Sequence, residues 1–218
     1  FTEAGKINKN APKEYIGLDR FEARKKILKE LKEKEFFVKE ENIKNKVPYG
    51  DRSNSIIEPF LTEQWFVNAQ KLSVKAKEIV NSKKTNFFPS NWSKTYFQWM
   101  NNIEPWCISR QLWWGHQIPA WYGPDKKIFV ELNENDAKKS ARKFYKKNVN
   151  LLRDSDVLDT WFSSGLWPFA TLGWPNKNEY LKKFYPTTVL VTGFDIIFFW
   201  VARMMMFGME FLNKEPFK

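Results

Sequence analysis

The chain has 218 residues, of which 43% are apolar and 28% charged, a composition typical of globular proteins and not of collagen or wholesale disorder. Its single cysteine, Cys107, excludes an internal disulfide framework and a cysteine-rich zinc site, and its single histidine, His116, excludes a histidine-rich metal site. The net charge of +11 favours a polyanionic partner such as tRNA, DNA or an anionic membrane, and compositional bias explains the same excess equally well.

The first third of the chain predicts two amphipathic helices separated by an irregular segment. Apolar residues on one face predict a helix from about Leu18 to Lys34. Asp19 can cap its first turn and Glu22 can bond back, so Asp19 is expected to be a helix cap rather than a catalyst. Residues 42–60 carry proline and glycine and predict loop with short strands, and residues 68–80 predict the second helix.

The middle of the chain is rich in tryptophan, whose large ring needs a pocket and whose N–H needs a partner. Most of the 11 tryptophans lie between Trp92 and Trp121, a stretch that we expect to be aromatic and irregular. Residues 134–150 are polar and rich in lysine, and they predict a surface helix or loop.

The last third of the chain alternates between strand-like and helix-like segments. Val157–Phe162 predicts a buried strand, and the β-branched run Thr188–Thr192 predicts a strand covered on both faces. Residues 179–184 predict a short helix, and a long helix is expected over about residues 195–211. Strand, helix, strand and helix in this order predict an α/β fold with a parallel sheet.

One apolar stretch, residues 189–209, is long enough to raise the possibility of a membrane span. Asp195 and Arg203 lie within it, and two charges are costly in hydrocarbon. Gly193 is expected at a turn from strand to helix, which also argues against a continuous span. We therefore expect no membrane partner.

A small binding pocket is expected where the predicted strands end, because ligands of open α/β sheets bind there. Asp195 follows Thr188–Thr192 and could hold a ligand ammonium, while Trp161 and Trp200 could bound an apolar space. Such a pocket suits an aliphatic amino acid. Each residue also has an ordinary structural explanation, since aspartate at a helix start is usually a cap and buried tryptophan is usually core.

Long tryptophan-rich motifs give a more specific indication. Nearly the whole chain resembles the valyl-type class I aminoacyl-tRNA synthetases, and the isoleucyl type, which shares the framework, is the alternative. The segments that carry the resemblance most strongly are WCISRQLWWGHQIPAWY (residues 106–122), DVLDTWFSS (156–164) and VTGFDIIFFWVARM (191–204). Two further segments also match, GLDRFEARK (17–25) and GDRSNSIIEPFLTEQWFV (50–67).

The resemblance implies a Rossmann catalytic domain that is interrupted by an inserted editing domain. Residues 1–47 would be the C-terminal end of the insertion, residues 48–155 the connecting segment, and residues 156–218 a portion of the second half of the Rossmann domain. The chain would thus be an internal piece of a longer protein. Trp161, Asp195 and Trp200 match residues that line the valine pocket of this family, with Asp195 expected on the substrate ammonium.

The implied activity is ATP-dependent ligation of valine to tRNA(Val), with threonine editing in the complete enzyme. Valine, tRNA(Val), the rest of the synthetase chain, and ATP with Mg²⁺ are the implied partners. The family's His-Ile-Gly-His and Lys-Met-Ser-Lys-Ser signatures do not occur among these residues, so no catalytic residue is expected here. Residues 48–59 contain no cysteine where some members have knuckles, so no zinc or other metal is expected.

The tRNA acceptor end is a further expected ligand. Arg110, Trp113 and Trp114 could stack on its unpaired bases, or they could pack the junction between domains. A non-catalytic tRNA-binding module built on the same scaffold is the alternative function. With no visible signal peptide and one cysteine, the expected location is the cytoplasm.

Overall fold

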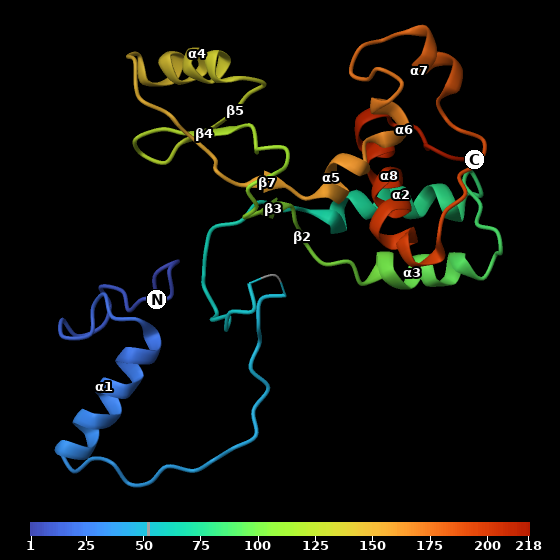
Figure 1. Cartoon of the computed structure of the whole chain (residues 1–218). Helices are drawn as coiled ribbons and strands as arrows, with labels where there is room; N and C mark the ends of the chain where they lie inside the picture. Colours follow the sequence, from blue (N-terminus) through green and yellow to red (C-terminus); the bar gives the residue numbers. More distant parts are fainter. Residues whose placement is uncertain (52) are drawn as a thin grey trace. The chain divides into compact units, whose positions relative to one another are not determined.

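The computed structural model describes residues 1–51 and 53–218, and mixes helices with short strands (Figure 1). These residues divide into two units, Phe1–Glu63 and Gln64–Lys218. The mixture of helix and strand agrees with the predicted α/β class at this coarse level. The predicted domain boundaries after residues 47 and 155 stay predictions.

The first unit contains helix α1 (Arg20–Glu33), which confirms the predicted helix. Asp19 caps it, because its side chain accepts a hydrogen bond from the backbone N–H of Phe21 at 2.8 Å. Glu22 does not complete the expected reciprocal bond and instead pairs with Lys25 at 3.2 Å. The start of α1 is therefore fixed by one side chain.

Arg20 connects α1 to the segment that follows it in the same unit. Its Nε lies 3.2 Å from a carboxylate oxygen of Glu58, and its Nη2 donates to the carbonyl of Ile56 at 2.9 Å. Residues 42–51 and 53–60 are irregular, with an isolated bridge between Tyr49 and Ile56 where short strands were expected.

The second unit has a helical core (Figure 1). Helix α2 packs on α3 and α8, and α5 also contacts α8. The bounds are α2 (Ala69–Asn81), α3 (Trp92–Asn101), α5 (Thr160–Ser164), α6 (Trp167–Ala170) and α8 (Ala202–Phe207). Their fully buried side chains include Tyr96, Met100, Phe169, and Met204 to Met206. Helix α2 confirms the helix predicted at residues 68–80.

The predicted long helix near the C-terminus is present, but its hydrogen bonding changes along its length. It starts as the 3-10 turn η1 (Phe194–Ile196), continues as the π-helical η2 (Ile197–Val201), becomes α8, and ends as the π-helical η3 (Gly208–Leu212). Such π turns within helices are frequent at functional sites. In the described part of the chain, no helix combines the length and apolarity that a membrane crossing requires.

The strands are short and their pairing is antiparallel. β1 (Phe66–Val67) pairs with β2 (Trp106–Cys107), and β3 (Ser109–Arg110) pairs with β7 (Val157–Leu158). A third sheet has the order β5-β4-β6, with β4 (Ala120–Tyr122) between β5 (Ile128–Val130) and β6 (Leu152–Arg153). Helix α4 (Glu134–Tyr145) contacts β5, so part of the lysine-rich segment is a helix. The predicted parallel sheet is wrong for the residues that the structure describes.

Two predicted segments contain helix where other structure was expected. The aromatic stretch from residue 92 begins with α3, so it is not irregular throughout. The strand predicted for Val157–Phe162 stops at Leu158, because Asp159 caps the short helix α5. An aspartate side chain favours a helix start over a strand interior, since it can accept the first free backbone N–H groups.

The expected covered strand Thr188–Thr192 forms no ladder with any described strand, and it is not covered. Val189 is 70% exposed and Val191 is 88% exposed. β-branched residues favour extended backbone, but a strand also needs a neighbour along its edge. The nearest pairing is one parallel bridge between Thr187 and Phe217. The short helix predicted at residues 179–184 is confirmed as α7 (Glu179–Phe184).

Candidate functional site

A buried aspartate lies where β7 passes into α5. Asp159 is 6% exposed, and its Oδ1 accepts a long hydrogen bond of 3.4 Å from the backbone N–H of Trp161. Its carbonyl accepts a bond from the N–H of Phe162 at 2.9 Å. Asp159 therefore fixes the first turn of the helix that carries Trp161, one of the predicted pocket residues.

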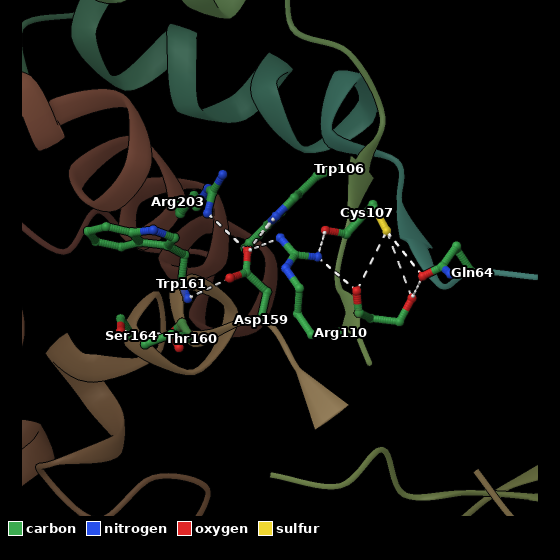
Figure 2. A network of polar contacts seen from close by, with 10 residues as sticks. Gln64, Trp106, Cys107, Arg110, Asp159, Thr160, Trp161, Ser164 and Arg203 are labelled. Atoms are coloured by element: carbon green, nitrogen blue, oxygen red, sulfur yellow. Dashed lines mark hydrogen bonds and ion pairs between the residues drawn. The ribbon is translucent and has the colours of Figure 1, made fainter. Parts of the chain in front are cut away.

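Three donors from other parts of the chain converge on the second carboxylate oxygen of Asp159 (Figure 2). The indole N–H of Trp106 donates to it at 3.0 Å. The guanidinium groups of Arg110 and Arg203 approach it at 3.2 Å and 3.5 Å. The Arg203 guanidinium also lies over Trp106, with its carbon 3.7 Å from the ring centroid. One carboxylate thus holds an indole and two cations.

The positive charge at this site exceeds the charge of Asp159. Burial lowers the pKa of Arg203 to about 10, Asp159 opposes this shift, and the nearby Arg110 adds to it. Arg203 Nη1 is buried and makes no hydrogen bond to a described residue, apart from its ion-pair approach to Asp159. Asp159 is therefore the group that makes a buried guanidinium tolerable here.

Of the two predicted pocket indoles, one belongs to α5 and the other is hydrogen-bonded to it. Trp161 lies on this helix, with its ring centroid 6.0 Å from that of Phe199. Trp200 lies on η2, and its indole N–H donates to the carbonyl of Ser164, the last residue of α5, at 3.0 Å. Both tryptophans are half-buried. The structure thus joins two residues that are far apart in the sequence.

The third predicted pocket residue, Asp195, lies on the turn η1 that precedes η2. Its side chain is exposed and is without a hydrogen bond or ion pair to the residues that the structure describes. Its carboxylate folds back over Gly193, where an added Cβ would lie 2.6 Å from Oδ1. Among the described residues, no hydrogen bond or ion pair joins Asp195 to Trp161 or Trp200.

An apolar cavity of about 510 Å³ lies next to this turn. Its lining includes Gly193, Phe194, Val189 and Trp92, and the rings of Trp92 and Phe194 stack with centroids 5.0 Å apart. Among the described residues, the lining does not include the three predicted pocket residues. This cavity is therefore not formed by the residues that the sequence predicts for the pocket.

The predicted tRNA contacts separate into two environments. The side chain of Arg110 is 40% exposed but bonded within the chain: its Nη1 donates to the carbonyls of Cys107 at 3.0 Å and Ser109 at 2.8 Å, besides its ion pair with Asp159. Trp113 is 95% exposed and Trp114 is 82% exposed, with ring centroids 6.2 Å apart. Arg110 fits the alternative of a packing residue, whereas the two tryptophans are available to a partner.

Residues 11–218 match the family model described as tRNA synthetases class I (I, L, M and V). The chain belongs to this family. It is 86% identical over 218 residues to the valine–tRNA ligase of Pelagibacter ubique (strain HTCC1062), covering all of this chain and 25% of that protein. The valine–tRNA ligase of Caulobacter vibrioides is 56% identical over 217 residues, which are 100% of this chain and 24% of the relative.

A third relative, the valine–tRNA ligase of Bartonella henselae, is 61% identical over 199 residues, which are 91% of this chain and 22% of the relative. These relatives confirm the resemblance to the valyl type that the motifs predict. The chain spans about a quarter of the length of the curated relatives it matches.

Sequence reasoning misses the central residue of this polar network. The sequence pattern places Asp159 in a strand, and it gives Arg203 no role beyond opposing a membrane span. Trp106 is one of many aromatic residues. The available signal is an aspartate directly before Thr160 and Trp161, which is a typical start of a helix. No local sequence signal indicates that Trp106 and Arg203 converge on Asp159.

A metal ion bound to this chain would need several ligating side chains that lie close together. Within residues 1–51 and 53–218, no group of three or more histidine, cysteine, aspartate or glutamate side chains is arranged to hold a metal ion. The prediction that this chain carries no zinc stays a prediction, and we derive no chemical step from a metal bound to it.

Proposed function

We propose that this chain supplies the amino-acid side of the activation site in an ATP-dependent valine–tRNA ligase. The observation that carries the proposal is the attachment of Trp161 and Trp200 to the single helix α5, in a chain 86% identical to a valine–tRNA ligase. One indole carried by this short helix and a second one hydrogen-bonded to its last residue can bound an apolar space, which suits recognition of a small branched side chain.

In this proposal Asp195 pairs with the ammonium group of valine. An exposed carboxylate with no partner in the described part of the chain is ready to accept such a ligand. Trp161 and Trp200 bound the isopropyl group of the same molecule. The charge pair fixes the orientation of the amino acid, and the rings limit the length of its side chain.

The proposed reaction has two steps. The carboxylate of valine attacks the α-phosphorus of ATP, which enters with Mg²⁺ as a substrate, and pyrophosphate leaves. The terminal hydroxyl of tRNA(Val) then attacks the acyl carbonyl and AMP leaves. Residues of this chain would act by positioning valine, without proton transfer, because correct orientation alone removes much of the barrier.

The proposed pocket has a known weakness. An apolar pocket cannot strongly reject an isostere in which a hydroxyl replaces a methyl group, and valyl enzymes with threonine are the usual illustration. Editing of threonine therefore belongs to the proposed complete enzyme. The residues for editing and the two ATP signatures are expected elsewhere in it, and cytoplasm is the proposed location.

The proposed architecture follows the family resemblance. Residues 156–218 would belong to an interrupted Rossmann domain, residues 48–155 would connect to it, and residues 1–47 would end the editing insertion. The match of residues 11–218 to the class I family model supports this architecture. Strands from the rest of the complete enzyme would then pair with Thr188–Thr192, which has no ladder among the described residues.

Replacing the proposed ammonium ligand tests the pocket directly. We expect Asp195→Ala in the complete synthetase to slow valine-dependent pyrophosphate exchange by about a hundredfold or more, because it removes one partner of a charge pair. Glu210→Ala is the matched control, since Glu210 is an exposed carboxylate on the same long helix. Near-normal exchange in the Asp195 variant would exclude the pocket assignment.

Recognition of the tRNA acceptor end is a second part of the proposal. The exposure of Trp113 and Trp114 favours it, because aromatic rings stack on unpaired bases. A non-catalytic tRNA-binding module would use the same two rings but would need no valine pocket. Loss of valine-dependent exchange in the Asp195 variant would favour the ligase. Loss of tRNA binding in the tryptophan variants with no effect of Asp195 would favour the binding module.

A further inference from the structure

The residues that contact the two ends of α5 also contact each other through the long C-terminal helix. Asp159 caps its first turn, and the carbonyl of Ser164 at its other end accepts the indole N–H of Trp200 at 3.0 Å. Arg203 follows Trp200 by one helical turn and returns to the carboxylate of Asp159 at 3.5 Å. Figure 2 shows Asp159 between Arg203 and Arg110, with Trp161 beside it.

We propose that Asp159 is a positioning residue for the amino-acid pocket, and that it sets the spacing of Trp161 and Trp200 through its ion pair with Arg203. This inference rests on the proposed function, because it assumes that these two indoles bound the substrate side chain. Asp159 itself touches neither valine nor ATP in this proposal.

The length of α5 is the first argument. A helix of five residues is not stable by itself, since helix nucleation is costly and few hydrogen bonds repay it. Its orientation must therefore come from tertiary contacts, which are its packing on α8 and η2 and the hydrogen bonds at its two ends. Asp159 makes the hydrogen bond at one end and Trp200 makes it at the other, so the place of Trp161 depends on both.

The charge distribution is the second argument. Arg203 is a cation whose side chain is 10% exposed, and its counter-charge is a carboxylate that it shares with Arg110. Without that carboxylate the two guanidinium groups would repel each other, and a buried cation would be unpaired. Arg203 would then move toward water, and the helix that carries Trp200 would move with it.

The chain offers a matched control in Asp154. Like Asp159, it is a buried aspartate that accepts an indole N–H, here from Trp65 at 2.8 Å. It also accepts the hydroxyl of Tyr122 at 2.6 Å and the backbone N–H of Asp156 at 2.9 Å. These contacts do not involve α5 or the long helix, so a purely structural effect can be separated from a pocket effect.

The experiment compares Asp159→Asn and Asp154→Asn in the complete synthetase, with KM for valine and for ATP measured by pyrophosphate exchange. Asparagine preserves the shape of the side chain and removes its charge. We expect Asp159→Asn to raise KM for valine by about tenfold, because the indoles are displaced, and to change KM for ATP by less than about twofold. Asp154→Asn is expected to change neither value by more than about twofold.

Arg203→Lys keeps the charge and loses the planar fork and the contact with Trp106. We expect it to raise KM for valine several-fold, but to have little further effect when Asp159 is already asparagine, because the two residues act through one contact. An Arg203→Lys effect of equal size in both backgrounds would overturn the proposal. If the Asp159→Asn variant does not fold, the Arg203→Lys variant tests the proposal by itself. An unchanged KM for valine in Arg203→Lys would then overturn the proposal.

Two further results would also overturn the positioning role of Asp159. One is an unchanged KM for valine in folded Asp159→Asn, and the other is an equal rise of both KM values in the two aspartate variants. The proposed function fails separately, since it requires loss of exchange in Asp195→Ala. Impaired Asp195→Ala with normal Asp159→Asn would leave the pocket standing and remove only the inference about Asp159.

Discussion

Two buried aspartates, Asp154 and Asp159, each accept an indole N–H and each fix the backbone that follows them. Their remaining partners differ in charge. Asp154 is surrounded by neutral donors, whereas Asp159 faces two guanidinium groups. Replacing Asp154 therefore removes hydrogen bonds, while replacing Asp159 also leaves a positive charge uncompensated.

Asp154 gives a prediction for acid stability. Burial raises the pKa of its carboxyl, but the hydrogen bonds from Tyr122, Trp65 and the N–H of Asp156 outweigh burial, and the pKa is lowered from its ordinary value of 3.8. A carboxyl with a lowered pKa in the folded state stabilises that state above its unfolded pKa. This stabilisation is lost as the pH falls through the folded pKa.

We therefore expect the free energy of unfolding of the intact protein to fall more steeply with acid than that of its Asp154→Asn variant. Urea titrations between about pH 3 and pH 6 measure this difference. The variant should be less stable at the upper end of the range, and the two curves should approach each other at the lower end. Parallel curves would show that Asp154 does not titrate at a lowered pKa.

Several helices of this chain begin with side chains that accept backbone N–H groups. Asp19 caps α1 at 2.8 Å, Asn68 caps α2 at 3.0 Å, and Asn133 caps α4 at 3.0 Å. Asn178 caps α7 at 2.9 Å. The long C-terminal helix lacks such a cap at Gly193 and starts instead with a 3-10 turn. The turn leaves Asp195 exposed, as the proposed pocket requires.

The cap of α1 can be tested because Ala23 is the buried residue of this helix, so the rest of α1 is open to solvent or partly so. We expect Asp19→Ala to destabilise α1 by about 1 kcal/mol, because one backbone N–H loses its acceptor. Hydrogen exchange of the α1 amides in the intact protein measures this loss. Asp19→Asn, which keeps an acceptor, should have little effect.

Glu22→Ala is the second control, because Glu22 does not complete the capping box and its contact is an exposed ion pair. Such pairs contribute about 0–1 kcal/mol. A loss of protection in Glu22→Ala as large as that in Asp19→Ala would contradict the assignment of Asp19 as the principal cap.

Over the whole molecule, charge and aromatic exposure predict different features of tRNA binding. In the proposed complex, a net charge of +11 would give binding that weakens with salt, since phosphate contacts release counterions. The proposed stacking by Trp113 and Trp114 would depend little on salt, because it does not involve charge. The two contributions can therefore be separated in one titration.

We expect the Trp113→Ala, Trp114→Ala double variant of the complete synthetase to bind tRNA(Val) more weakly at every salt concentration, with an unchanged dependence on salt. The loss should be about 1–3 kcal/mol for each stacked base. Filter binding at several salt concentrations measures both quantities. Leu132→Ala is the control, since Leu132 is a 94% exposed apolar residue outside this segment. Equal affinities of the double variant and the control would exclude the tRNA contact.

The sequence by itself determined the features that depend on neighbouring residues. Helices α1, α2 and α7 follow from apolar periodicity and from caps, and both signals lie within a few residues of the segment that they predict. The family was also determined by the sequence, because its motifs are long and rich in tryptophan. The sequence also indicates Trp161 and Trp200, first by their position where the predicted strands end and then as members of these motifs.

Only the tertiary structure decided which distant residues meet. Thr188–Thr192 has the composition of a strand, but strand formation depends on a neighbour that composition does not specify. The contacts of Asp159 come from Trp106, 53 residues away, and from Arg203 on another helix. Hydrogen bonds and ion pairs act over a few ångströms in space. Their partners are therefore chosen by the packing of the whole chain and not by the local sequence.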